Sequence, residues 1–128
     1  MITTETSQFS RECSAWRDAL RSQREKIKEQ KKELGLLASN ETNPELMAEI
    51  GHLDNQFHIQ LINIHDLRQA MKKHDQRVND ERKRNGGVLA EETVQHHENL
   101  FDDFQRLETT LHGVQQEYAY FIRQARVF

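Results

Sequence analysis

Hydrophobic residues recur along the chain at alternating intervals of three and four, which is the spacing of one face of an α-helix. The interval averages about 3.5 residues, as along the seam of a coiled coil, and we call these positions the seam. The three series are Phe9, Cys13, Trp16, Leu20, Gln23, Ile27, Gln30, Leu34 and Leu37; Leu46, Ile50, Leu53, Phe57, Gln60, Ile64, Leu67, Met71, His74 and Val78; and His97, Leu100, Phe104, Leu107, Leu111, Val114, Tyr118, Phe121, Ala125 and Phe128. They predict helices over about 4–39, 43–84 and 89–127.

Two short polar segments separate the three series. The first, ASNETNPEL, supplies Asn40 to end a helix and Thr42 or Asn43 to cap the next, with Pro44 in its first turn and Glu45 for a capping box. The second, RNGGVLAEE, supplies Asn-Gly-Gly to end a helix and two acids for the start of another. Short connections place consecutive helices antiparallel. The sequence therefore predicts an all-α, up-down-up antiparallel three-helix bundle with long coiled-coil-like helices.

The registers of the three series agree when the chain is folded at its two breaks. Folding at residues 41–42 places Gln23 opposite Gln60, so that the two side-chain amides can hydrogen-bond each other. Such a buried polar layer costs stability but helps to fix the register of the helices. Folding at residue 87 brings the end of the third helix to the start of the second. We therefore expect one domain, residues 1–128, with nearly continuous core layers.

Composition narrows the class of protein. The chain is 35% hydrophobic and 30% charged, its mean hydropathy is −0.92, and it has no run of about 18 apolar residues, so we expect no membrane span. The first ten residues, MITTETSQFS, have neither the basic nor the apolar region of a signal peptide. The single cysteine, Cys13, cannot form an internal disulfide. Together these features predict a soluble cytoplasmic protein.

Charge is unevenly distributed, although the net charge is only −3. Residues 17–33 and 68–84 are rich in Arg and Lys, whereas residues 91–108 are acidic. The simplest interpretation is that oppositely charged helices lie side by side. A nucleic-acid surface would need a basic face that carries aromatic residues for base stacking. Here acids interleave with the basic residues and no aromatic residue joins them, so we expect no nucleic-acid binding.

Two apolar residues of the second helix, Ile59 and Ile62, point away from the seam on a helical wheel. The face around them consists of Asn55, His58, Ile59, Ile62, His65, Asp66, Gln69 and Ala70. Single exposed apolar residues are ordinary, but two neighbouring β-branched residues on the outside of a middle helix indicate a contact surface. We predict that this face binds a protein partner. A homodimer is the simplest case, because a two-fold interface uses the same patch twice.

Seven histidines among 128 residues raise the question of metal binding. Two pairs have the helical spacing of shared ligands, Glu49 with His52 and Glu108 with His112. Di-iron bundles use Glu-x-x-His pairs that project inward. Only the first pair has that spacing, and both pairs lie beside or outside the seam. We therefore predict no metal site and no other cofactor, and we keep a metal-binding bundle as a third alternative.

Three further residues with reactive side chains fall on the seam itself. His74 and His97 lie near the second connection, where the pattern favours hydrogen-bonded core residues over metal ligands. Cys13 lies three residues before Trp16 on the first seam, which predicts a buried structural thiol. A reactive thiol would need exposure and a positively charged neighbourhood.

The string HDLR, residues 65–68, resembles the phospho-acceptor box of sensor histidine kinases, and it is similar to the His-x-Leu-Lys/Arg core of histidine phosphotransfer domains. The resemblance implies that His65 accepts a phosphoryl group, that Asp66 raises its reactivity or acts as base, and that Arg68 favours the phosphate charge. The helical wheel places His65 on the outside, as this role requires. Gln69 stands where phosphotransfer domains usually carry Gly.

No catalytic triad, Gly-rich phosphate loop or Cys pair is present in the sequence. We therefore expect a non-catalytic helical scaffold or adaptor for protein–protein interaction that self-associates through the second helix. A phosphorelay protein using His65 is the alternative, and a metal-binding helical bundle is the third.

Overall fold

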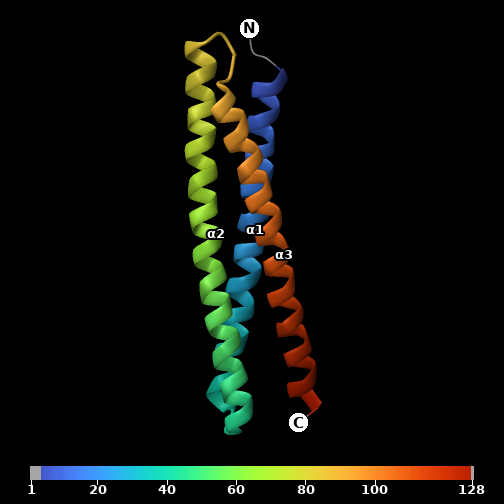
Figure 1. Ribbon diagram of the computed structural model, residues 1–128. Coiled ribbons are helices and arrows are strands. Elements are labelled where there is room, and N and C mark those ends of the chain that lie inside the picture. The colour runs from blue at the N-terminus through green and yellow to red at the C-terminus, as the bar shows by residue number, and fades with distance from the viewer. Residues whose placement is uncertain (1–3, 128) are drawn as a thin grey trace.

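The computed structural model describes the backbone of residues 4–127 and the side chains of residues 6–125. It contains three helices, α1 (Thr4–Asn40), α2 (Pro44–Arg84) and α3 (Glu91–Val127). They run alternately up and down in one elongated bundle (Figure 1). The predicted all-α three-helix bundle is confirmed, and the helix bounds differ from the predicted ones by at most two residues. The coiled-coil character of the helices stays a prediction.

The two ends of the bundle are built differently. The loop end holds the α2–α3 connection, residues 85–90, and the start of α1. The turn end holds the α1–α2 connection, residues 41–43, and the end of α3 (Figure 1).

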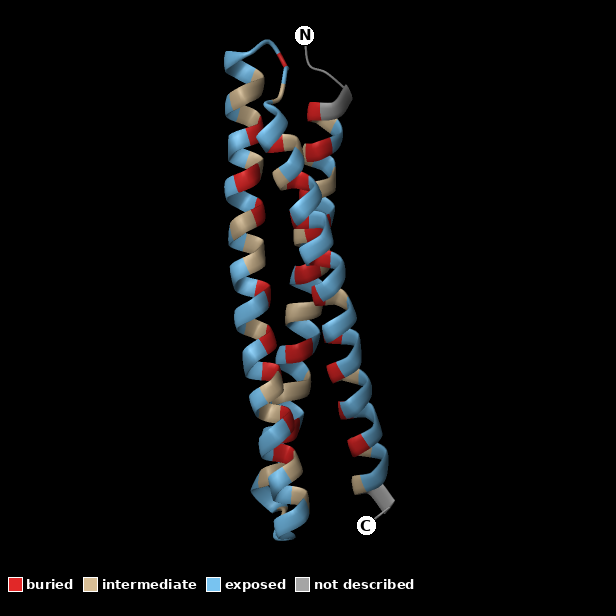
Figure 2. Ribbon diagram, viewed as in Figure 1, coloured by how far each residue is buried: buried red, intermediate tan, exposed pale blue. Residues whose placement is uncertain are grey.

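One stripe of each helix is buried and the stripes face the middle of the bundle (Figure 2). Every residue of the main apolar core is a seam residue: Cys13, Trp16, Leu20, Ile27, Leu34, Ile50, Leu53, Phe57, Ile64, Met71, Leu100, Phe104, Leu107, Leu111, Val114, Tyr118 and Phe121. Burial of such side chains, at about 25 cal/mol per Å² of apolar surface, is what stabilises long helices in water. None of the described helices has a stretch long and apolar enough to cross a membrane. Phe128, the last predicted seam residue, lies outside the described residues.

The turn end is built as a helix cap. The side-chain Oδ1 of Asn43 accepts hydrogen bonds from the backbone N–H groups of Glu45 and Leu46, at 2.9 and 3.4 Å, and Pro44 is the first residue of the helix. The predicted capping box differs in one respect. Glu41, and not Glu45, accepts the hydrogen bond of the Asn43 backbone N–H, at 2.9 Å.

The loop end depends on two glycines in the left-handed region of backbone conformation. Gly86 has a φ of 64° and Gly87 a φ of 94°, which residues with a Cβ rarely adopt. The Gly87 N–H donates to the carbonyl of Arg82 at 3.0 Å and closes the last turn of α2. The buried Thr6 hydroxyl donates to the Gly87 carbonyl at 3.0 Å, so the start of α1 is tied to the loop.

Gln23 and Gln60 do not hydrogen-bond each other as predicted, because each pairs with a different residue. Gln23 Oε1 accepts a hydrogen bond from Gln115 Nε2 on α3 at 2.9 Å. Gln60 Oε1 accepts from Asn63 Nδ2 on its own helix at 3.2 Å. A pairing of α1 with α2 alone leaves out the third helix, whose Gln115 amide binds Gln23 in place of Gln60. Gln60 is nevertheless buried, as its seam position predicts.

Charge pairing between helices follows the expectation only in part. Arg77 of the basic stretch of α2 lies 3.7 Å from Glu92 at the start of α3, as opposite charges on neighbouring helices predict. Arg68 of the same stretch lies near three arginines and one acid, Asp18, of α1, and the arginines have the larger effect. Its burial, and after it these like charges, lower the pKa of the Arg68 guanidinium.

Candidate functional site

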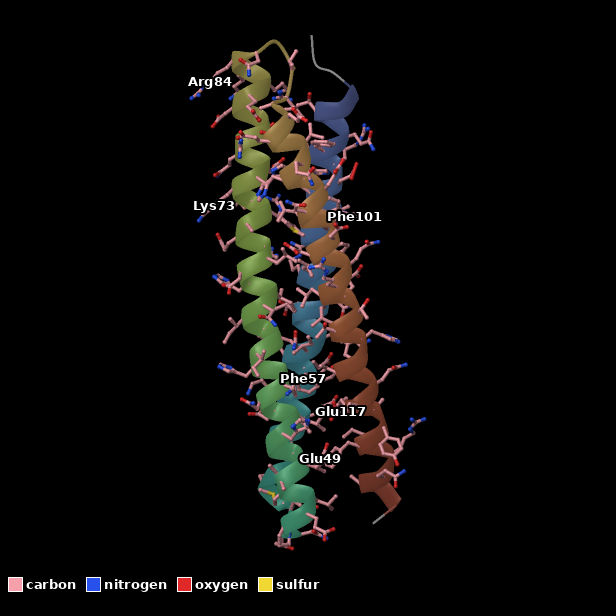
Figure 3. All side chains as sticks on the ribbon, in the orientation of Figure 1. Glu49, Phe57, Lys73, Arg84, Phe101 and Glu117 are labelled. Atoms are coloured by element: carbon pink, nitrogen blue, oxygen red, sulfur yellow. The ribbon has the colours of Figure 1, made fainter. Side chains whose placement is uncertain are left out.

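The outer face of α2 is exposed as the sequence predicts, except at Ala70, which is partly buried and packs against the apolar core. All seven predicted interaction residues are exposed: Asn55, His58, Ile59, Ile62, His65, Asp66 and Gln69. Ile59 keeps 39% and Ile62 keeps 48% of its surface in contact with water. Lys73 marks this side of α2 in Figure 3, where the side chains project away from the other two helices.

The polar residues of this face have no partner among the residues that the structure describes. Within the described part of the chain, the side chains of Asn55, His58, His65, Asp66 and Gln69 make no hydrogen bond and no ion pair. The face therefore has an apolar centre, Ile59 and Ile62, with polar side chains on both sides that make no hydrogen bond within the described chain. Such groups are free to pair with a binding partner.

The three phospho-acceptor residues of the HDLR string have different surroundings. His65 and Asp66 share the exposed face of α2. Arg68 is half-buried, and its Nε is buried without a hydrogen-bond partner in the described chain. Its electrostatic neighbours on α1 are three arginines and, with a smaller and opposite effect, Asp18. The structure thus brings two of the three residues together on the surface.

One of the predicted ligand pairs belongs to a surface cluster. His52 Nε2 lies 3.1 Å from Glu117 Oε1 across the α2–α3 contact, and a carboxylate oxygen of Glu49 lies within 4.8 Å of both (Figure 3). His52 and Glu117 are exposed. Glu108 and His112, which the structure also describes, belong to no such group.

A second cluster of ligand-type side chains lies inside the bundle near the loop end. Cys13 of α1, His74 of α2 and His97 of α3 are 1%, 1% and 4% exposed. His74 Nε2 lies 2.9 Å from His97 Nδ1, and Cys13 Sγ lies 4.0 Å from the same nitrogen. One ligand atom from each residue lies within 4.8 Å of the other two. The predicted buried thiol and hydrogen-bonded core histidines are confirmed, but that they meet was not predicted.

The surroundings of His97 fix the orientation of its ring. Its Nε2 lies 3.3 Å from Glu12 Oε2. An ionised carboxylate only accepts hydrogen bonds, so Nε2 carries the proton and Nδ1 keeps its lone pair on the side of Cys13 and His74. The ring of Phe9 stacks on the His97 ring at 3.7 Å with an angle of 4°. Stacking holds the ring without using its nitrogen atoms.

Burial sets the protonation states of this cluster. It lowers the pKa of His74 to about 4, with His97 adding to the effect. It also lowers the pKa of His97, which the hydrogen bond to Glu12 opposes. Burial raises the pKa of the Cys13 thiol to about 12, and the nearby Asp75 carboxylate contributes to the rise. At neutral pH both imidazoles are therefore neutral and the thiol is protonated.

The Cys13 thiol contacts the His97 imidazole, which contacts the Glu12 carboxylate. Enzymes with a cysteine nucleophile and a general base arrange the same three groups in this order. A catalytic thiol needs access to substrate and a lowered pKa. Cys13 is 1% exposed and its pKa is raised, so neither condition is met. Neutral imidazoles and a thiol turned inward are instead the side chains that bind soft or borderline metal ions.

A signal for this cluster was present in the sequence. The three residues are the thiol and the two imidazoles of the seam, and all three stand in the half of a helix nearest the second connection. The sequence analysis placed His74 and His97 near the second connection but did not predict that they meet each other or Cys13. No protein-family model matches this chain, and no significant match was found among curated proteins or among solved structures.

Proposed function

We propose that the protein is a non-catalytic cytoplasmic scaffold or adaptor that self-associates through the outer face of α2. The observation that carries the proposal is the exposure of Ile59 and Ile62, 39% and 48%, in the middle of the longest helix. The polar residues around them have no partner within the described chain. A reducing compartment such as the cytoplasm would also keep the single Cys13 as a thiol.

A second copy of this chain fits the face in an antiparallel pairing of two α2 helices centred on Ile62. Asp66 lies four residues after Ile62 and His58 four residues before it, so the carboxylate of each copy would face an imidazole of the other. Gln69 and Asn55 lie seven residues after and before the centre, so two pairs of amides would also face each other. This complementarity of charge and hydrogen bonding across a two-fold axis supports a homodimer over an unrelated partner.

The energetics favour a weak dimer. Full burial of an Ile side chain is worth about 1.5–3 kcal/mol, and these two are already about half covered, so each contributes less. Association costs on the order of 4–15 kcal/mol. The apolar centre therefore only about offsets that cost, and the His–Asp and amide pairs supply the surplus. Exposed pairs contribute about 0.2–1 kcal/mol each. We therefore expect a dissociation constant far weaker than about 1 μM, which would need a surplus of about 8 kcal/mol.

Sedimentation velocity over a wide range of protein concentrations tests the proposal. The unaltered chain should shift from monomer to dimer as concentration rises, whereas Ile62→Asp should remain monomeric. Leu36→Asp is the matched control, because Leu36 is an exposed apolar residue (62%) on a different helix and should leave the dimer intact. An unaltered chain that stays monomeric at the highest concentration, or an Ile62→Asp variant that still dimerises, contradicts the proposal.

Charge substitutions test the antiparallel register separately. His58→Asp places two carboxylates opposite each other in each half of the interface and should weaken the dimer. Adding Asp66→His to the same chain exchanges the pair and should restore the affinity. A double variant as weak as His58→Asp alone would mean that His58 and Asp66 do not face each other.

Phospho-acceptance by His65 is the second candidate function, favoured by the exposure of its ring beside Asp66. It predicts acid-labile phosphate on the chain after incubation with a small phosphodonor. The label should be lost in His65→Gln and kept in His58→Gln, which alters another exposed histidine of the same face. Equal labelling of the His65→Gln variant would exclude this function.

A further inference from the structure

We propose that Cys13, His74 and His97 form a binding site for one transition-metal ion of the zinc type, held inside the bundle near the loop end. Each helix contributes one ligand: Cys13 Sγ from α1, His74 Nε2 from α2 and His97 Nδ1 from α3. A bound ion would join all three helices at the end where the chain begins. This site is independent of the outer face of α2.

The distances between the ligand atoms suit a single tetrahedral ion. Zinc binds imidazole nitrogen at about 2.0–2.1 Å and thiolate sulfur at about 2.3 Å, so its ligand atoms lie about 3.3–3.7 Å from each other. The separations of His97 Nδ1 from His74 Nε2 and from Cys13 Sγ, 2.9 and 4.0 Å, lie on either side of that range, and the third is within 4.8 Å. Small side-chain rotations would bring all three atoms to bonding distance.

His97 already has the surroundings of a metal ligand. In metal sites the ring nitrogen that does not bind the ion usually donates its N–H to a carboxylate, which fixes the tautomer and makes the other nitrogen more basic. His97 donates from Nε2 to Glu12 Oε2 at 3.3 Å and presents the lone pair of Nδ1 to the cluster. Glu12 thus acts as the positioning residue of the site.

Hydrogen bonding alone leaves the cluster poorly satisfied. The single lone pair of His97 Nδ1 is approached by two donors, the His74 N–H at 2.9 Å and the Cys13 S–H at 4.0 Å, and it can satisfy only one of them well. An ion would accept an electron pair from each of the three groups, so the competition for one lone pair would disappear.

Protons and charge both balance when the ion binds to the three ligands. The Cys13 S–H bond breaks as the sulfur–metal bond forms, and that proton leaves to solvent. The His74 ring proton moves from Nε2 to Nδ1, which frees the Nε2 lone pair for the ion. The two positive charges of the ion are then matched by the Cys13 thiolate and the Glu12 carboxylate. A neutral group is the arrangement that a protein interior tolerates best.

A surface groove adjoins the cluster at His97. The groove is lined by residues of α1 and α3, among them Phe9, Glu12, His97 and Phe101, the last of which is labelled in Figure 3. His97 therefore borders both the groove and the buried cluster. Three protein ligands leave the fourth tetrahedral position to a water molecule, as in open zinc sites.

Cobalt(II) titration of untagged, chelator-treated protein tests the site. We expect one ion per chain, intense visible bands of tetrahedral cobalt, and a near-ultraviolet thiolate-to-cobalt band that Zn²⁺ abolishes by displacement. Cys13 is the only cysteine, so the thiolate band identifies the ligand even if a Cys13→Ala variant fails to fold. Glu12→Gln should keep the band and bind about 10–100-fold more weakly.

Two variants separate this site from the other surfaces. His52→Gln removes the histidine of the exposed Glu49–His52–Glu117 cluster and should bind cobalt as the unaltered chain does. Ile62→Asp should also bind cobalt normally, whatever its effect on self-association. Cobalt binding without a thiolate band, or binding that is lost in His52→Gln and kept in Cys13→Ala, would overturn the proposal.

Discussion

The two halves of the bundle share one seam pattern but are filled with different chemistry. The turn half is packed with aliphatic and aromatic side chains, including Ile27, Leu34, Ile50, Leu53 and Phe57. The loop half holds four of the five buried polar side chains among the described residues, namely Thr6, His74, Thr93 and His97. Spacing along the helix therefore decides which residues are buried. The type of residue decides whether its burial raises or lowers the free energy of unfolding.

The cost of burial differs between the two halves for a physical reason. A buried apolar side chain gains free energy in proportion to the area removed from water. A buried polar group gains little when it is paired and costs about 1–3 kcal/mol when it is not. His74 Nδ1 and Thr93 Oγ1 are both buried without a hydrogen-bond partner. Stability should therefore come mainly from the turn half, while the loop half supplies groups able to bind a ligand.

The largest effect is expected from Phe57→Ala in the turn half. Phe57 is fully buried and its ring lies 5.5 Å from that of Tyr118, so its removal leaves a cavity between α2 and α3. We expect a loss of about 3–5 kcal/mol in the free energy of unfolding, measured by urea denaturation. Phe101→Ala is the control, since Phe101 is 40% exposed in the loop half and should cost much less. Equal losses would mean that the turn half is not the main source of stability.

The second effect is a dependence of stability on pH in chelator-treated protein. The pKa of His74 is about 4 in the folded chain and 6.5 when unperturbed, so the unfolded state takes up a proton first as pH falls. Stability is complete above pH 6.5 and declines between pH 6.5 and about 4, by on the order of 3 kcal/mol at most. Urea denaturation at several pH values measures the slope. The slope of stability against pH should be smaller in His74→Leu than in the unaltered chain.

The helices and their caps were predictable because they depend on local sequence. Apolar spacing marks the buried stripe, and the Asn43–Pro44 pair marks the start of α2 within a single turn of helix. The capping box was predicted with Glu45, whereas the side chain of Glu41 accepts the backbone N–H of Asn43. The local sequence shows that a nearby acid completes the cap, but it does not show which acid.

The buried cluster was not predictable in detail because it depends on how three helices are placed at once. The seam positions placed His74 and His97 near the same connection without pairing them, whereas the structure puts their nitrogen atoms 2.9 Å apart. The same limit explains the wrong partner of Gln23, which pairs with Gln115 of the third helix. Glu12 is a further example, since nothing in its position beside the seam indicates that it orients His97.

A smaller effect is expected at the turn end, where the side chains of Asn43 and Glu41 accept the hydrogen bonds of the connection and Asn43 alone caps α2. Asn43→Ala removes the acceptor of the Glu45 and Leu46 N–H groups and should cost about 1 kcal/mol of unfolding free energy. Thr42→Ala is the control and should change stability by less than about 0.5 kcal/mol, because its side chain is exposed and does not cap the helix. Thermal unfolding followed by circular dichroism measures both. If Thr42→Ala lost as much stability as Asn43→Ala, Asn43 would not be the residue that caps α2.

The smallest effect on stability is expected from His74→Leu, and it bears most directly on the difference between the halves. Leu removes a buried imidazole whose Nδ1 has no partner, and it also removes the hydrogen bond to His97, so the two changes about cancel. We expect unfolding free energy within about 1 kcal/mol of the unaltered chain and much weaker cobalt binding. The reverse exchange, Leu53→His, buries an imidazole among aliphatic side chains in the turn half and should cost several times more. If His74→Leu were as damaging as Leu53→His, then His74 would be a structural core residue, and the polar loop half would need no ligand to explain it.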